Sequence, residues 1–251
     1  RSPKNSNPIF IWELILRGDN MRFLKVISTI FMVVMTVLNS SCNSKLFETF
    51  ATKNQVGSVA MMVNDGSNYW FSSHWGPVLR YDPVEKKYFK YSFNKGPSIE
   101  GIMTMELVNG KVWIGLHKLG IAVYNSEKDD FFFYNMDHGL AGIKDEDGKI
   151  SKVTAIAPDY EDNKIWVGTI YAGLSYYDLS KNKWFIIKDP LVKNIDVDSI
   201  AVNDSYIAVT ANQGIYLFNK KNNKWKFCGD IPDRIALDDI NVTNESLIIK
   251  V

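Results

Sequence analysis

Histidine and cysteine are scarce in this sequence, which has three His and two Cys among 251 residues. So few of these side chains leave little scope for a histidine-based catalytic triad or a Cys/His metal centre. The Gly-x-Ser-x-Gly and His-Glu-x-x-His motifs of common hydrolases and metalloproteases are also absent. The sequence therefore predicts a protein that is not an enzyme, and we assign no catalytic residue, metal or cofactor.

An excess of charge of either sign is lacking as well. Lys and Arg number 29 against 28 Asp and Glu, a formal net charge of +1. Residues 1–41 hold five basic and two acidic residues, so the remainder has 24 basic against 26 acidic side chains. A near-neutral chain without a basic stripe is not typical of a nucleic-acid-binding protein.

The sequence has no apolar run long enough to cross a membrane as a helix, which needs about 20 residues. Its best candidate is the 13-residue run from Val26 to Leu38, which follows Met21 and the basic residues Arg22 and Lys25. This order is typical of an export signal. We assign residues 21–41 to a signal peptide and regard residues 1–20 as lying upstream of a true start at Met21.

Cys42 comes directly after this signal, and the small residue Ser41 precedes it. The arrangement resembles the lipobox of bacterial lipoproteins, in which the cysteine sulfur takes a diacylglycerol. The resemblance implies lipidation of Cys42, a tether over residues 42–55, and a place in the bacterial cell envelope, on the periplasmic side or at the cell surface. An ordinary signal peptide with an incidental cysteine is the alternative.

Aromatic residues, in contrast, are abundant at 13%, and several recur at regular intervals. The positions Trp70, Trp113, Trp166, Ile207 and Ile248 align with spacings of 43, 53, 41 and 41 residues. In the unit around Trp166, two β-branched apolar runs flank a polar turn, and two aromatic runs follow, which predicts a four-stranded antiparallel meander. A period of about 40 to 50 residues with four strands is typical of a β-propeller blade.

Other features recur around the aligned positions. A glycine precedes each third strand, and each third strand ends in an aromatic residue followed by Asp or Asn. We place the propeller at 56–251, with blades at about 56–93, 100–134, 152–188 and 197–228 and a partial blade at 237–251. Trp113 and Trp166 are expected to be buried between neighbouring blades.

These repeats resemble the two-component regulator propeller repeat, whose consensus has an acidic turn, an Ile-Trp-Ile-Gly-Thr strand, a glycine turn and a strand ending in Tyr-Asp. Residues 153–178 match it best, with Ile165 to Thr169, Gly173 and Tyr177-Asp178 in place. The resemblance implies a propeller fold and, by association with sensor ectodomains of bacterial two-component systems, a ligand-sensing role.

Residues 237–251 repeat only the first half of a unit, and propellers usually close with about four to eight blades. We therefore expect four complete blades plus the start of a fifth, in a chain that is the N-terminal part of a longer reading frame.

Loops between second and third strands should project on one face of a propeller, and they carry aromatic and polar side chains that suit a glycan or a protein ligand. The aromatic rings could stack on a sugar, and the polar groups could hydrogen-bond it. A metal held by His74, His117 and His138 is a weaker alternative, since nothing fixes the spacing of ligands across three loops. The predicted ligand-binding residues are His74, Trp75, His117, Lys118, Tyr171, Asn212 and Gln213.

Three functions follow from these features. The first is an envelope lipoprotein that binds a glycan or protein ligand through its propeller, touching the membrane only through its lipid anchor. The second is the N-terminal ectodomain of a two-component sensor histidine kinase. The third is a propeller-type polysaccharide lyase or hydrolase, which would need an acid, a base and a cation converging on the axis.

Overall fold

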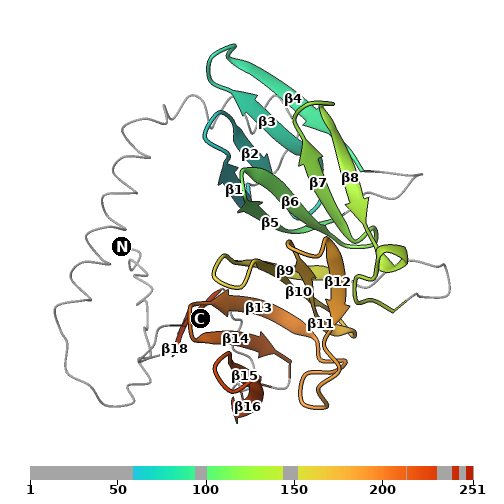
Figure 1. The fold of residues 1–251 in the computed structure, drawn as a ribbon. Helices are drawn as coiled ribbons and strands as arrows, with labels where there is room; N and C mark the ends of the chain where they lie inside the picture. Colours follow the sequence, from blue (N-terminus) through green and yellow to red (C-terminus); the bar gives the residue numbers. More distant parts are fainter. Residues whose placement is uncertain are drawn as a thin grey trace, which may run out of the picture.

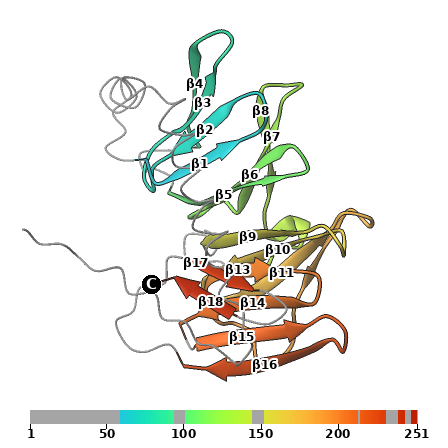
Figure 2. The same cartoon turned by 90° about the vertical axis from the view of Figure 1, so that its left-hand side faces the viewer.

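The computed structural model describes residues 59–93, 101–143, 152–212 and 214–230, together with the pairing of strands over 239–242 and 247–250. Within these ranges the regular structure is all β except for one short 3-10 segment, η1 (Met136–His138). Figures 1 and 2 show the sheets following one another in the order of the chain.

The first sheet contains β1 (Met61–Asn64), β2 (Tyr69–Ser72), β3 (Val78–Asp82) and β4 (Lys87–Tyr91). The second contains β5 (Ile102–Val108), β6 (Lys111–Leu116), β7 (Ile121–Asn125) and β8 (Asp130–Tyr134). The third contains β9 (Val153–Asp159), β10 (Lys164–Thr169), β11 (Gly173–Asp178) and β12 (Lys183–Ile186). The fourth contains β13 (Val197–Val202), β14 (Tyr206–Ala211), β15 (Gly214–Asn219) and β16 (Lys224–Gly229), and β17 (Asp239–Val242) pairs with β18 (Leu247–Lys250).

Each sheet is an antiparallel meander in which every strand pairs with the next one in the chain. The first strands lie beside one another, β1 with β5, β5 with β9, β9 with β13 and β13 with β17. Sheets whose first strands adjoin in this way are arranged like the blades of a propeller. The structure thus confirms the predicted fold class of four complete blades and two strands of a fifth.

The repeated tryptophans form the contacts between blades. Trp70 packs edge-on against Tyr124 of the next blade at 4.5 Å between ring centroids, and Trp113 lies 6.1 Å from Tyr177. Trp70, Trp113 and Trp166 are all at most 4% exposed. Because an aromatic pair contributes about 0.5–1.5 kcal/mol beyond its buried area, each repeat stabilises the blade that follows it.

The glycine two residues after the tryptophan permits this close approach. A Cβ built on Gly115 would lie 2.7 Å from the carbonyl oxygen of Val153 in the next blade. At Gly168 the corresponding Cβ would lie 2.7 Å from Cβ of Val197, again in the next blade. In the Trp-x-Gly pattern, the tryptophan fills the interface with the next blade, and the glycine leaves room for the backbone or side chain of that blade.

The polar residue that ends each third strand shapes the following turn. Asp178 Oδ1 accepts the Ser180 backbone N–H at 3.1 Å, and Asn219 Oδ1 accepts that of Lys221 at 3.0 Å. Asp82 and Asn125 accept equivalent bonds in the first two blades. Short Asp and Asn side chains favour such turns, which explains why only these two residue types occupy the position.

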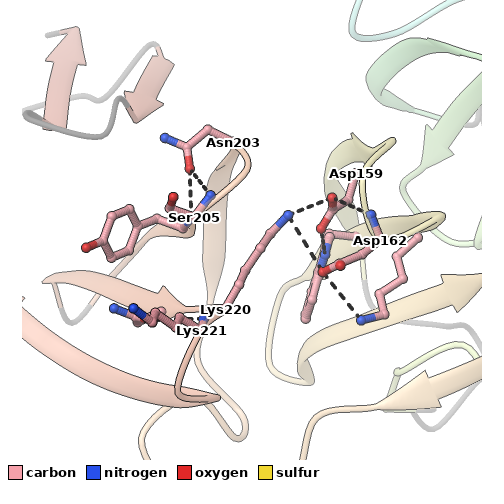
Figure 3. A network of polar contacts seen from close by, with 10 residues as sticks. Asp159, Asp162, Asn203, Ser205, Lys220 and Lys221 are labelled. Carbon is pink, nitrogen blue, oxygen red and sulfur yellow. Dashed lines mark hydrogen bonds and ion pairs between the residues drawn. The ribbon is translucent and has the colours of Figure 1, made fainter.

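A buried ion pair joins the third and fourth blades at the end of the sheets where β10 begins (Figure 3). Lys220 Nζ lies 2.7 Å from Asp159 Oδ1, with side-chain exposures of 9% and 1%, and 3.7 Å from Asp162 Oδ2. Asp159 Oδ2 also accepts Trp166 Nε1–H at 3.3 Å. The acidic turn of one repeat thereby fixes both its own tryptophan and a lysine of the next repeat.

Candidate functional site

The loops between second and third strands lie at the opposite end of the sheets from this ion pair, and we call this end the rim. In the second, third and fourth blades, a backbone hydrogen bond joins this loop to the residue just before the first strand of the same blade. His117 N donates to Gly101 O at 2.9 Å, Ile170 N to Lys152 O at 3.0 Å, and Asn212 N to Asp196 O at 3.1 Å. The rim is therefore built from two sets of segments, the loops and the lead-in residues.

Between the first two blades the rim carries an exposed tryptophan. Trp75 forms an isolated β-bridge with Gly101, and its ring meets the His117 ring edge-on at 5.3 Å between centroids. A Cβ on Gly101 would lie 3.1 Å from both His117 Cβ and Trp75 Cζ3, so a larger residue would have to displace these side chains by a few tenths of an ångström. Trp75 nevertheless remains 59% exposed. We call Trp75, Gly101 and His117 the Trp75 platform.

Hydrogen bonds hold the backbone on both sides of the Trp75 side chain. Ser73 Oγ donates to Trp75 O at 2.8 Å, and Ile102 N donates to His74 O at 2.9 Å. The indole itself contacts the His117 ring on one edge and is otherwise exposed, an arrangement suited to stacking on a flat partner.

His117 lies partly buried beside two cations. Burial, followed by the charges of Lys152 and Lys118, lowers the pKa of the imidazole below its ordinary value. Both lysines are themselves partly buried. His117 is thus held neutral at pH 7 in positive surroundings, where it can donate from one ring nitrogen and accept at the other.

A second group of residues lies where the third and fourth blades meet. Tyr171 has φ of 68°, a left-handed conformation that is rare for a bulky residue. Its N–H donates to Asp196 Oδ1 at 2.7 Å, and Asn212 Nδ2 donates to Asp196 Oδ2 at 3.1 Å. Asp196 thereby fixes both neighbours, while the Tyr171 side chain is 62% exposed. Burial and the charge of Asp196 raise the pKa of the nearby Asp198.

A β-bulge follows the first residue of three first strands. In β5, β9 and β13 the pairing register shifts at Met103, Thr154 and Asp198. Thr154 Oγ1 donates to Val197 O of the next blade at 2.5 Å. Bulges redirect side chains and often occur beside functional sites, and here they recur at the rim end of the strands.

The predicted site residues fall into two groups. Trp75 and His117 are in contact, with Lys118 close enough for its charge to act on His117, and His74 is exposed in the same loop as Trp75. Tyr171 and Asn212 meet through Asp196, whereas Gln213 and Cys42 lie outside the described residues. His138 packs against Phe132 and Tyr134 of β8, and the described residues contain no group of three His, Cys, Asp or Glu side chains that could hold a metal ion.

Sequence reasoning missed Gly101, Lys152 and Asp196. All three occupy the position just before a first strand. Aligning the blades at that position, as well as at the tryptophan, would have singled them out.

No family model and no curated protein matches this sequence. Solved structures with a similar fold include the extracellular domain of the putative hybrid two component system BT4673 from B. thetaiotaomicron, with a TM-score of 0.59, 14% identity, and coverage of 77% of this chain and 27% of that chain. The corresponding domain of BT3049 from the same organism has a TM-score of 0.55, 17% identity, and coverage of 76% and 26%. The computationally designed Ika8 protein has a TM-score of 0.51, 10% identity, and coverage of 76% and 55%.

This chain thus spans about a quarter of the length of the two extracellular domains. In the described part of the chain, no helix is both long enough and apolar enough to cross a membrane. At this level of identity the comparisons establish a shared fold.

Proposed function

We propose that this chain forms the ligand-binding part of an exported, sensor-like ectodomain, and that its ligand is a glycan bound at the rim. The observation that carries the proposal is the Trp75 platform, where the backbone of Trp75 is bridged to Gly101 and its indole contacts His117 yet remains 59% exposed. Aromatic faces stack on the apolar faces of sugar rings, and polar groups around them hydrogen-bond the hydroxyls.

The second rim group supports the same role. Tyr171 presents another exposed ring, and Asp196 and Asn212 beside it carry hydrogen-bonding groups. The likeness in fold to extracellular domains of putative two component systems supports a sensory role over a catalytic one. A protein ligand is the alternative, to be told apart by experiment.

The test is calorimetric titration of the protein with a panel of neutral and acidic oligosaccharides. Trp75→Ala should weaken binding of any oligosaccharide ligand by about 1–3 kcal/mol, since it removes a central aromatic anchor. The matched control is Tyr160→Ala, because Tyr160 is equally exposed at 60% but lies in the β9–β10 turn at the opposite end of the sheets.

Binding that Tyr160→Ala abolishes and Trp75→Ala leaves intact would place the site at the other end. If no oligosaccharide binds, the glycan proposal fails and a protein ligand takes its place. Release of shortened oligosaccharides during the titration would instead show a lyase or hydrolase.

We also propose that Cys42 carries a lipid that anchors the protein in the cell envelope. The support is the order of basic residues, apolar run and small residue before Cys42. A single acyl chain binds membranes only marginally, and two chains give stable anchoring. Cys42→Ser should therefore move the protein from the membrane fraction to the soluble envelope fraction. Cys228→Ser is the control, and identical fractionation of both variants would contradict lipidation.

A further inference from the structure

Tyr171 has a backbone conformation that its residue type does not favour. Among the described residues, eight other than glycine have a positive φ, and six of them are Asn or Asp, the types that tolerate this conformation best. Tyr171 is the only aromatic residue of the eight, with φ of 68°. An Asn at this position would form the same turn with less strain, so the turn itself does not explain the tyrosine.

Packing does not explain the Tyr171 ring either. The side chain is 62% exposed, and none of the ring contacts in the described part of the chain involves it. An aromatic ring left in water adds little stability, because hydrophobic stabilisation is proportional to the apolar area that is buried. Backbone strain of this kind is found mostly at active sites and ligand clamps. The ring is thus placed for contact with a ligand.

Asp196 of the next blade holds the backbone of Tyr171. Its Oδ1 accepts the Tyr171 N–H at 2.7 Å. Asp196 is itself held by Asn212, which donates from Nδ2 to Asp196 Oδ2 at 3.1 Å and from its backbone N–H to Asp196 O at 3.1 Å. These three hydrogen bonds join the β10–β11 loop to two segments of the fourth blade, so the position of Tyr171 is set from outside its own blade.

The same arrangement occurs at Trp75. Trp75 lies in the loop after β2, and its backbone bridges Gly101, which leads into β5 of the next blade. Tyr171 lies in the loop after β10, and its backbone is bonded to Asp196, which leads into β13 of the next blade. Each exposed ring therefore lies at a junction between two blades, and the two junctions are two blades apart.

This separation is larger than one sugar ring. Packed sheets lie about 10 Å apart, so equivalent loops two blades apart are separated by roughly 20 Å. A disaccharide stacked on Trp75 is too short to reach Tyr171 as well. A chain of several sugars that reaches both rings makes its second contact within the complex already formed, which raises its affinity above that of either contact alone.

We propose, building on the proposed function, that the rim binds an extended glycan chain through two aromatic subsites, Trp75 and Tyr171. Asp196 is a positioning residue, which holds Tyr171 at the rim through the hydrogen bond to its backbone. The ligand class is an oligosaccharide of several units or a segment of a polysaccharide. A disaccharide occupies the Trp75 subsite alone.

Calorimetric titration with oligosaccharides of graded length tests the two subsites. The probes are cello-oligosaccharides, malto-oligosaccharides and oligogalacturonides, each from disaccharide to octasaccharide. In the series that binds, the octasaccharide should bind at least about tenfold more tightly than the disaccharide, because only the longer chain reaches both rings. Equal affinity at all lengths would overturn the proposal.

Tyr171→Asn removes the second ring and keeps a residue suited to a positive φ. The variant should be at least as stable as the original protein. It should bind the octasaccharide about tenfold more weakly, because an aromatic anchor is lost, and bind the disaccharide equally well. Tyr160→Asn is the matched control and should change no affinity, since Tyr160 is 60% exposed at the opposite end of the sheets.

Two results with Tyr171→Asn would contradict the second subsite. A loss of affinity that is the same for every length would show a single compact site. A large loss of stability would show that the fold requires the ring.

Asp196 is tested together with Tyr171. Asp196→Ala removes the acceptor of the Tyr171 N–H and should weaken octasaccharide binding about tenfold, whereas Asp196→Asn keeps an acceptor oxygen and should retain most of the affinity. In the Tyr171→Asn protein, Asp196→Ala should cause no further loss, because the ring that it positions is already gone. Additive losses would show that Asp196 contacts the glycan directly and would overturn its positioning role.

The two proposals fail separately. If Trp75→Ala weakens binding at every length and Tyr171→Asn weakens none, the rim has one subsite and only this inference falls. If none of the three series binds, this inference falls, and if no panel oligosaccharide binds either, the proposed function falls with it.

Discussion

At the scale of single residues, Lys220 and Asp159 show how a repeat fixes its neighbour. Each is a charged residue in or beside a polar turn of the sequence, yet the structure leaves the side chains only 9% and 1% exposed in a 2.7 Å ion pair (Figure 3). A buried ion pair contributes little net stability, because the cost of removing both charges from water offsets their attraction. Removal of one partner is destabilising, because the other charge then stays buried and unpaired.

Replacing Lys220 with Met should lower the free energy of unfolding by roughly 3 kcal/mol, because the Asp159 carboxylate remains buried. Denaturant titration measures the change. Lys221→Met is the matched control, since Lys221 is exposed in the same turn, and it should stay within about 0.5 kcal/mol of the original protein.

Adding Asp159→Asn to Lys220→Met removes the stranded charge and should recover part of the lost stability. A Lys220→Met protein as stable as the Lys221→Met protein would show that water reaches the pair and that the blades do not depend on it.

At the scale of elements, the contact between β10 and β13 depends on an absent side chain. Gly168 lies where a Cβ would overlap Val197 Cγ1 and stand 2.7 Å from Val197 Cβ in the next blade. Crowding of this kind usually costs about 1–3 kcal/mol, because neighbouring strands must shift.

Gly168→Ala should therefore lower the free energy of unfolding by about 1–3 kcal/mol, as measured by thermal and denaturant unfolding. Val197→Ala removes Cγ1, the atom that the new methyl group would overlap most closely, and keeps only Cβ. In a double-mutant cycle the two changes should then be less damaging together than the sum of the single effects. Strict additivity would mean that Gly168 is required for its own strand and not for the packing between blades.

The elements themselves could be predicted from the sequence because their signals are local and repeated. Three features mark each four-stranded sheet: a tryptophan in the second strand, a glycine before the third strand, and an Asp or Asn at the end of the third strand. Only the fourth complete blade lacks the tryptophan. The fourth blade has Ile207 in place of tryptophan and was found through its spacing.

The site was less predictable because its halves come from different blades. Trp75 meets Gly101 and His117 only after two sheets pack together. The bulged residues Met103, Thr154 and Asp198 are of three different types. No sequence motif therefore predicts the bulges.

At the scale of the whole molecule, the described blades form a series of similar interfaces. Each hydrophobic cluster between blades draws side chains from two neighbours: Trp70 with Tyr124, Trp113 with Tyr177, and Trp166 with Ile207. Stability in such repeats is close to a sum of nearest-neighbour contributions.

Hydrogen exchange should follow this arrangement. Amides of β6, β10 and β14, which pair on both sides and are mostly buried, should exchange slowest, and those of the outer strands β4, β8, β12 and β16 fastest. Mass spectrometry of exchanged peptides measures the order. Gly168→Ala should speed exchange in β10 and β13 and leave β2 unchanged. Equal acceleration in all blades would show that the molecule opens as one unit.

The exposed ring of Trp75 has an optical consequence. Of the six tryptophans in the described residues, Trp75 is 59% exposed and Trp225 is partly buried, whereas Trp70, Trp113, Trp166 and Trp184 are at most 4% exposed. Their fluorescence should be blue-shifted and sheltered from iodide, and that of Trp75 red-shifted and readily quenched. A sugar that covers the indole would then shift the emission to shorter wavelength and shield it from the quencher. The native protein thus contains its own fluorescent reporter at the proposed binding surface.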